Sequence, residues 1–332
     1  MKIFAPQYYK EFRCIADACP DSCCKEWTVD VDAESAERYR RLPGQLGQRL
    51  REVLQETPDG WCMIIENGRC PMWRQDGLCR IQTELGHDAL CKTCREFPRI
   101  SHDYGNFQEL GLELSCPEAA RIILTSDKWN FEQFHTDEVG VVEYDATLMN
   151  ILRRSRNEAL FFLEESPYPL PQTLAIILLF AHHIQNEIDG GEIASIQADS
   201  FLSQCNALPK TSDIGALFAF FKGLEILTPR WKEHLSKPPA EIKWTPALKS
   251  LARYLIQRYW LQAVSDYDLV SRGKLVVCSC ILVGALGGDQ IQTAQLFSKE
   301  IENDPDNIDA ILDGAYTAPA LTDQNLLGIL LA

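Results

Sequence analysis

The residues best suited to chemistry are cysteines, and they are concentrated in the first third of the chain. Ten of the 13 cysteines lie between Cys14 and Cys116, in a chain of 332 residues. Thiolates bind soft and borderline metal ions, and a single metal centre needs several of them. Free cysteine also packs well in hydrophobic cores, but so dense a group is too large for packing alone. The region therefore predicts a metal centre.

The spacing of these cysteines bears on which metal they hold. They are Cys14, Cys19, Cys23, Cys24, Cys62, Cys70, Cys79, Cys91, Cys94 and Cys116. Proline follows Cys19, Cys70 and Cys116, and a Cys-Pro step also ends the ligand run of bacterial ferredoxins. Zinc sites more often show two short pairs with a spacer. The pattern favours an iron–sulfur cluster, with zinc as the alternative, and Cys62 is the best candidate for simple packing.

Charge and composition exclude several classes of protein. The net charge of −15 argues against nucleic acid and against an anionic membrane surface as partners. No apolar stretch reaches the roughly 20 residues that a membrane span needs, and the first residues lack the apolar core of a secretion signal. We therefore expect a cytoplasmic protein. An odd number of cysteines in a reducing compartment does not predict a disulfide framework.

Short elements are expected to position the cysteines within residues 1–125. Alternating polar and apolar residues predict a strand over 27–31, and a helix is expected over 33–54, interrupted at Pro43-Gly44. Asn67-Gly68 is the dipeptide that type I′ hairpin turns favour. Few of these segments can bury a large apolar face, so a bound metal is expected to supply much of the folding free energy.

The remaining residues, 126–332, predict helices. Apolar residues recur at helical spacing behind capping candidates such as Asp213 and Thr245. Helices are expected over 146–165, 174–188, 214–224, 246–259, 274–286, 290–302 and 307–314, and the acidic residues of 300–313 are expected on a solvated face. Cys205, Cys278 and Cys280 lie in apolar stretches and are expected in the core. The prediction is a mainly α protein in which a small cysteine-rich metal-binding module with little β structure, residues 1–125, packs on an α-helical C-terminal domain, residues 126–332.

Four segments resemble the flagellin lysine-N-methylases: FRCIADACPDSCCKEWTVDVD at 12–32, GLCRIQTELG at 77–86, TCREFPR at 93–99 and LSCPEAARIIL at 114–124. A weaker likeness runs through ARYLIQRYWLQAV at 252–264. The resemblance implies methyl transfer from S-adenosylmethionine to surface lysine ε-amines of flagellin, and a cysteine-bound [4Fe-4S] cluster. On this pattern the cysteines of the cluster region are Cys19, Cys23, Cys24, Cys79, Cys94 and Cys116, with Cys14 and Cys70 as further matches.

The sequence leaves the ligand set and the donor site open. One four-iron cluster takes four cysteines, fewer than the resemblance supplies. No glycine-rich strand–loop–helix for a nucleotide cofactor is present, so the cluster itself is a candidate anchor for the methionine part of the donor. Arg95 and Arg99, beside Cys94, are candidates to bind the donor carboxylate. Two other functions stay open: a non-enzymatic zinc- or cluster-binding recruitment module, and an iron–sulfur redox or electron-transfer protein.

Overall fold

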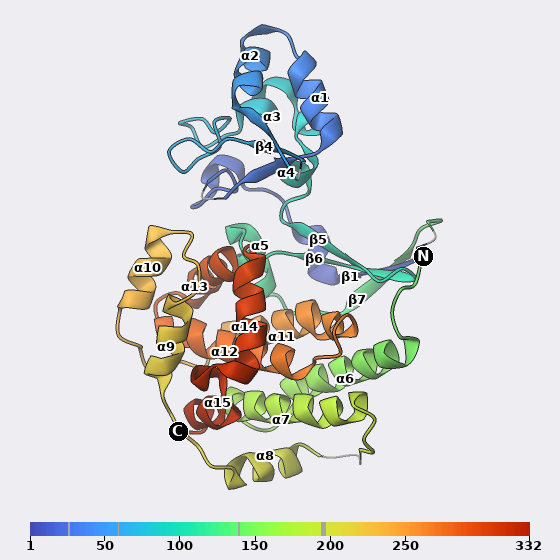
Figure 1. The fold of residues 1–332 in the computed structure, drawn as a ribbon, viewed down its shortest axis with the longest axis vertical. Helices are drawn as coiled ribbons and strands as arrows, with labels where there is room; N and C mark the ends of the chain where they lie inside the picture. The colour runs from blue at the N-terminus through green and yellow to red at the C-terminus, as the bar shows by residue number, and fades with distance from the viewer. Residues whose placement is uncertain (26, 59, 139, 194–196) are drawn as a thin grey trace.

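The computed structural model describes residues 1–25, 27–58, 60–138, 140–193 and 197–332. Helices account for 58% of the chain and strands for 11%, so the predicted mainly α class is confirmed. Figure 1 shows a small N-terminal module above a larger body built mostly of helices. Among the described residues, no helix combines the length and the apolar character needed to cross a membrane.

The N-terminal module is a three-stranded antiparallel sheet covered by short helices. Its strands lie in the order β2 (Val29–Val31), β4 (Gly60–Met63), β3 (Leu54–Thr57). The helices are α1 (Ala33–Arg41), α2 (Gly44–Val53), α3 (Arg80–Leu85) and α4 (Lys92–Glu96). The predicted break at Pro43-Gly44 is confirmed, because α1 and α2 meet there. Asn67 and Gly68 have φ of +52° and +72°, as a type I′ turn requires.

A second, four-stranded sheet lies between the module and the helices, and the sequence did not predict it. Its strand order is β5 (Arg99–Asp103), β6 (Phe107–Leu112), β1 (Lys2–Pro6), β7 (Phe131–His135). β1 runs parallel to β6, with Lys2 opposite Phe107, and antiparallel to β7. Tyr8, Phe107 and Leu112 are buried in the hydrophobic cluster of the helical body, whereas a separate cluster containing Val29 and Leu50 fills the module. The predicted domain boundary at residue 125 stays a prediction, since burial does not test independent folding.

The helical body contains the expected helices and several others. The expected ones are α6 (Ala146–Glu165), α7 (Leu170–Ile188), α9 (Ile214–Lys222), α11 (Pro246–Tyr259), α12 (Val270–Leu286), α13 (Gln290–Phe297) and α14 (Pro305–Thr317). Those not predicted are α5 (Pro117–Thr125), α8 (Ala198–Ala207), α10 (Pro229–Ser236) and α15 (Asp323–Leu330). Helix α12 is buried on nearly every side. The prediction that Cys205, Cys278 and Cys280 belong to the core is confirmed, because all three are fully buried.

The expectation of a solvated acidic face over 300–313 is wrong at its beginning. Residues Ser298–Glu302 form a π-helical turn after α13, and Lys299, Glu300 and Glu302 are all buried. The Glu300 carboxylate accepts a hydrogen bond of 2.8 Å from the backbone N–H of Leu227. These side chains are buried because they have internal polar partners, which a sequence pattern does not reveal.

Candidate metal centre and adjoining cleft

Six cysteines of the N-terminal module lie within electrostatic reach of others in the same group: Cys23, Cys24, Cys70, Cys79, Cys91 and Cys94. Backbone pairing holds several of them in place. The N–H of Cys70 donates to the carbonyl oxygen of Cys24 at 2.7 Å, and Cys79 forms an isolated antiparallel bridge with Trp73. The six thiols lie close enough that the ionisation of one affects the pKa of others in the group.

Within this group, two pairs of thiols are in direct contact. A hydrogen bond with Cys24 lowers the pKa of Cys23, while the same contact raises the pKa of Cys24. Cys91 and Cys94 form a second such pair, in which the pKa of Cys91 is lowered and that of Cys94 is raised. Each pair therefore reaches its singly ionised form more easily than two isolated buried thiols would.

Cys91 is the member of this group that the sequence assignment omitted. It precedes α4 as the N-cap residue and is almost fully buried. The signal was present as the Cys91-x-x-Cys94 spacing, but a single pair of that kind is weak evidence. Burial of Cys62 in β4 agrees with the packing role expected for it.

The other predicted cysteines form a smaller set near the start of α5. Cys14, Cys19 and Cys116 lie within electrostatic reach of one another, and burial raises the pKa of Cys116 to about 12. Cys14 is exposed, and Cys19 is partly exposed. Because Cys19 also interacts with Cys23, it lies between the two sets.

The chemistry of the donor set fits a thiolate metal centre. Several soft donors share one half-buried region, and their mutual repulsion on ionisation would be relieved by a bound cation. The described residues nevertheless contain no group of three or more His, Cys, Asp or Glu side chains arranged to hold a metal ion. The thiols are in contact as pairs, so the two pairs would have to approach each other to bind a single metal centre.

Asp21, in the loop between Cys19 and Cys23, ties the cysteines to the helical body. Its carboxylate contacts Lys25 at 2.7 Å and accepts hydrogen bonds from Lys299 at 3.1 Å and Gln295 at 3.3 Å. Lys299 belongs to the π-helical turn, and its Nζ lies 5.1 Å from the ring centre of Trp27. A buried lysine from the helical body therefore faces the cysteine-bearing loop.

A cleft of about 770 Å³ opens between the module and the helical body. Lys25, Trp27 and Arg69 line it from the module, and Asn303 and Asp304 line it from the other side. Lys25 and Arg69 directly follow and precede the paired residues Cys24 and Cys70, so the cleft adjoins the thiol group along the chain. Its size is that of sites for small organic molecules.

The two arginines proposed for donor binding occupy different surroundings. Arg95 is half-buried in α4 directly after Cys94. Arg99 begins β5, and its guanidinium lies 5.1 Å from the ring centre of Phe12 and 5.8 Å from that of Tyr9. The lining of the cleft includes neither of them.

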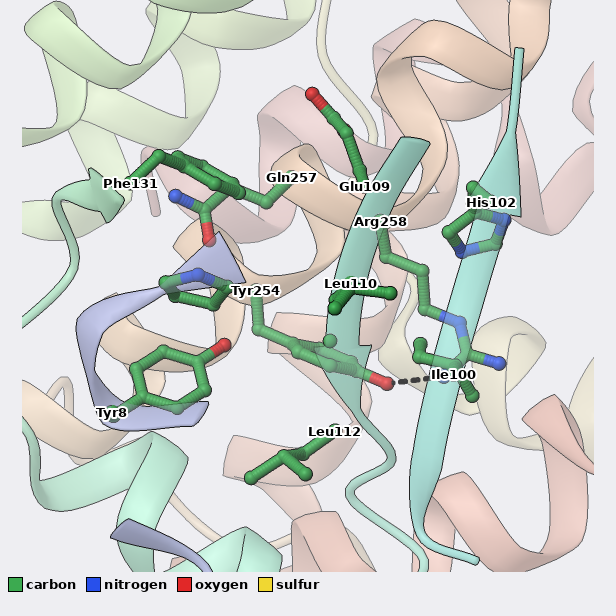
Figure 2. A pocket seen from close by; sticks show the side chains of 12 residues that line it. Tyr8, Ile100, His102, Glu109, Leu110, Leu112, Phe131, Tyr254, Gln257 and Arg258 are labelled. Carbon is green, nitrogen blue, oxygen red and sulfur yellow. Dashed lines mark hydrogen bonds between the residues drawn. The ribbon is translucent and has the colours of Figure 1, made fainter. Parts of the chain in front are cut away.

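A polar network that the sequence did not predict joins α11, the π-helical turn and the segment after β6. Arg258 of α11 donates to the Tyr254 hydroxyl at 2.6 Å and pairs with Glu302 at 3.3 Å and Glu113 at 3.4 Å. Figure 2 shows the Tyr254 hydroxyl bonded to Arg258, which lies between Tyr254 and His102 of β5. These residues line a cavity of about 30 Å³ that has room for about two waters. Burial, aided by Arg258, lowers the pKa of His102 to about 4. These residues are far apart in sequence and follow no motif.

The architecture and the site define a class: a mainly helical protein with a thiol-rich N-terminal module. The chain is 33% identical over 126 residues to the flagellar biosynthetic protein FliU of Salmonella muenchen, a match covering 36% of this chain and 75% of FliU. The same identity and length relate it to the lysine-N-methylases of Salmonella typhimurium and Salmonella choleraesuis. The chain belongs to the flagellin lysine-N-methylase family, which these relatives represent.

The match spans only part of these relatives. It covers 31% of each lysine-N-methylase, so the chain corresponds to about a third of their length. No family model matches the chain, and no solved structure matches it.

Proposed function

We propose that the protein transfers a methyl group from S-adenosylmethionine to the ε-amine of surface lysines in flagellin, and that this activity depends on a [4Fe-4S] cluster held by its cysteines. The observation that carries the proposal is the gathering of six thiols beside a cleft, in a chain related to lysine-N-methylases. Ligands are proposed among Cys23, Cys24, Cys79, Cys91 and Cys94, with Cys70 close by. Cys19, Cys116 and Cys14 form the smaller set.

The residues of the cleft suit a donor that carries both an amino acid and a nucleoside. Lys25 and Arg69 place positive charge where a carboxylate can bind, and the Trp27 indole offers a flat apolar surface for a base. A cluster held by these cysteines would supply a further site for the amino and carboxylate groups of the donor. Arg95, next to Cys94, is proposed to bind the same carboxylate, and Arg99 is proposed in that role only if it leaves the rings of Tyr9 and Phe12.

The transfer step balances without a redox partner. The neutral lysine nitrogen attacks the methyl carbon of the sulfonium, a C–N bond forms, the C–S bond breaks, and S-adenosylhomocysteine leaves. The lysine must first lose a proton, and the positive charges of Lys25 and Arg69 in the cleft favour its neutral form. Asp304 faces the cleft and can orient the incoming ammonium group through its carboxylate.

The test combines metal analysis with a direct assay of the product. Protein purified without oxygen should contain iron and acid-labile sulfide, and mass spectrometry of flagellin should show methylated lysines. Cys23→Ser and Cys94→Ser should lose both cluster and activity, whereas the matched control Cys62→Ser should retain them. Stoichiometric zinc without sulfide would contradict the iron–sulfur cluster and support the zinc alternative. Methylation at the wild-type rate by cluster-free protein would contradict the proposed dependence.

A further inference from the structure

A hollow of about 660 Å³ lies at the end of β5 remote from the cysteines. Its walls come from residues 101–105 at the β5–β6 turn, residues 141–145 before α6, and residues 262–267 after α11. β5 begins at Arg99, close to Cys94, and a strand rises about 3.3 Å per residue, so the turn lies on the order of 13 Å further along the chain. The hollow is therefore separate from the metal centre.

The walls of this hollow carry negative charge. Asp103, Glu143 and Asp145 line it, and the described lining residues include no lysine or arginine. Asp103 accepts a hydrogen bond of 2.8 Å from the N–H of Gly105 through Oδ1, and Asp145 caps α6 through its own Oδ1. These contacts fix the direction of both carboxylates, and the second oxygen of each is the atom that can accept a hydrogen bond from a ligand. The charge complements a cation.

Three tyrosines complete the lining: Tyr104, Tyr144 and Tyr267. Tyr104 stacks on Phe107 with ring centres 4.8 Å apart, and the Tyr144 hydroxyl donates to Asn106 at 2.6 Å. Tyr267 is 50% exposed at the rim and has φ of +62°. A bulky residue rarely adopts that backbone conformation, and such strain is often found at functional sites.

Two glycines allow the walls to touch. A Cβ atom at Gly105 would lie 2.1 Å from the carbonyl oxygen of Val141, and one at Gly140 would lie 2.3 Å from the carbonyl oxygen of Gly105. Both distances are far below a van der Waals contact, so the two segments meet only because neither residue has a side chain. The hollow is thus bounded by packed backbone on this side.

We propose that this hollow binds a lysine side chain of the protein substrate, as a docking subsite separate from the lysine that is methylated. Carboxylates pair with the ammonium group, and tyrosine rings attract it through their faces. Val141, which lines the hollow and is 76% exposed, offers apolar surface to the aliphatic stem. The inference rests on the proposed function, because it assumes a lysine-bearing protein substrate.

Binding is measured apart from catalysis, with a labelled synthetic peptide of glycine, serine and two lysines as the probe. Fluorescence anisotropy should detect binding to the full chain, and acetylation of both lysines should abolish it. The variant Asp103→Asn/Glu143→Gln should weaken binding about tenfold, since each exposed pair contributes modestly. Tyr267→Leu should also weaken peptide binding, whereas Tyr267→Phe, which keeps the aromatic ring, should bind the peptide as the wild type does. The control Asp309→Asn/Asp313→Asn, which removes two exposed carboxylates of α14, should bind as the wild type does.

The outcomes separate this inference from the proposed function. The inference is overturned if the wild type does not bind the peptide, if acetylated and free peptides bind equally, or if the hollow variants bind as tightly as the control. If the peptide binds as expected but flagellin is never methylated, the docking site stands and the proposed activity fails. If flagellin is methylated, the double variant should raise KM about tenfold with kcat unchanged, and an unchanged KM contradicts the inference.

Discussion

Cys62 and Cys91 are both buried and differ in what surrounds them. Cys62 lies in the middle strand of the module sheet, whereas Cys91 contacts the thiol of Cys94. We predict that Cys91→Ser weakens metal retention by about tenfold or more, as loss of a ligand or of its supporting partner does in other sites. Iron, zinc and sulfide per protein chain after dialysis against a chelator measure the effect. Equal metal contents in Cys91→Ser and Cys62→Ser would show that Cys91 takes no part.

His102 gives the unfolding free energy a dependence on acid pH. Its pKa is about 4 in the folded chain and about 6.5 in an unfolded one, so the unfolded state binds more protons between these values. The contribution of neutral His102 to the unfolding free energy is fully present above pH 6.5 and is lost as the pH falls towards 4. Urea titrations at pH 7 and pH 4.5 should show a smaller acid loss for His102→Gln than for the wild type. The exposed His87→Gln is the control and should follow the wild type.

At the scale of single residues, the sequence predicted which residues belong to the candidate site better than it predicted how they are arranged in space. The cysteines were identifiable because thiols are rare and clustered in the sequence. The pairing of Cys23 with Cys24 follows from their adjacency, but the approach of Cys70 to Cys24 depends on a backbone bridge between distant segments. The network of Arg258, Glu113 and Glu302 was not predictable, because charged residues give no sequence signal of burial until their partners are known.

The π-helical turn after α13 is the element that joins the helical body to the cysteine loop. Lys299→Met removes the buried cation that faces Asp21, and breaking a buried pair costs about 3–5 kcal/mol when one charge is left behind. We expect a loss of about 3 kcal/mol in unfolding free energy, reduced by the remaining contact of Asp21 with Lys25. Lys237→Met removes an exposed pair with Glu233 and should leave the unfolding free energy nearly unchanged, since water screens such a pair.

Hydrogen exchange locates the effect of this substitution. Amides of residues 19–24 should exchange faster in Lys299→Met, while those of α12 should not, since α12 is buried within the helical body. If Lys299→Met changed the exchange rates of residues 19–24 and of α12 equally, the π-helical turn would not specifically stabilise the cysteine loop.

Element prediction succeeded where signals are local. α6 occupies the predicted residues 146–165, because its apolar stripe follows a clear cap at Asp145. α8 and α10 were missed because they are short, at 10 and 8 residues, and each buries only two side chains. The four-stranded sheet was missed for a different reason: its strands are only 5 or 6 residues long. In addition, β1 pairs with β6 and β7 across more than a hundred residues of sequence, as Lys2 does with Phe107.

The described residues of the whole molecule form two hydrophobic cores of very different size. One, within residues 29–91, fills the module, and the other fills the helical body. Because the smaller core is limited, a bound metal is expected to stabilise the module in particular. Calorimetry should therefore show two unfolding transitions. A chelator should lower the midpoint temperature of the transition that belongs to the module and leave that of the helical body unchanged. A single transition that shifts as a whole would indicate that the two parts unfold together.

The placement of β1 has a consequence for the order of events during synthesis. Its partners are β6 and β7, which begin at Phe107 and Phe131. At roughly 5–20 residues per second, a ribosome needs on the order of 5–25 s to make the intervening chain. The module core ends at Cys91 and can close within that interval. A nascent chain can thus bring the thiols of the module together, and bind the proposed metal, before either strand that pairs with β1 has been synthesised.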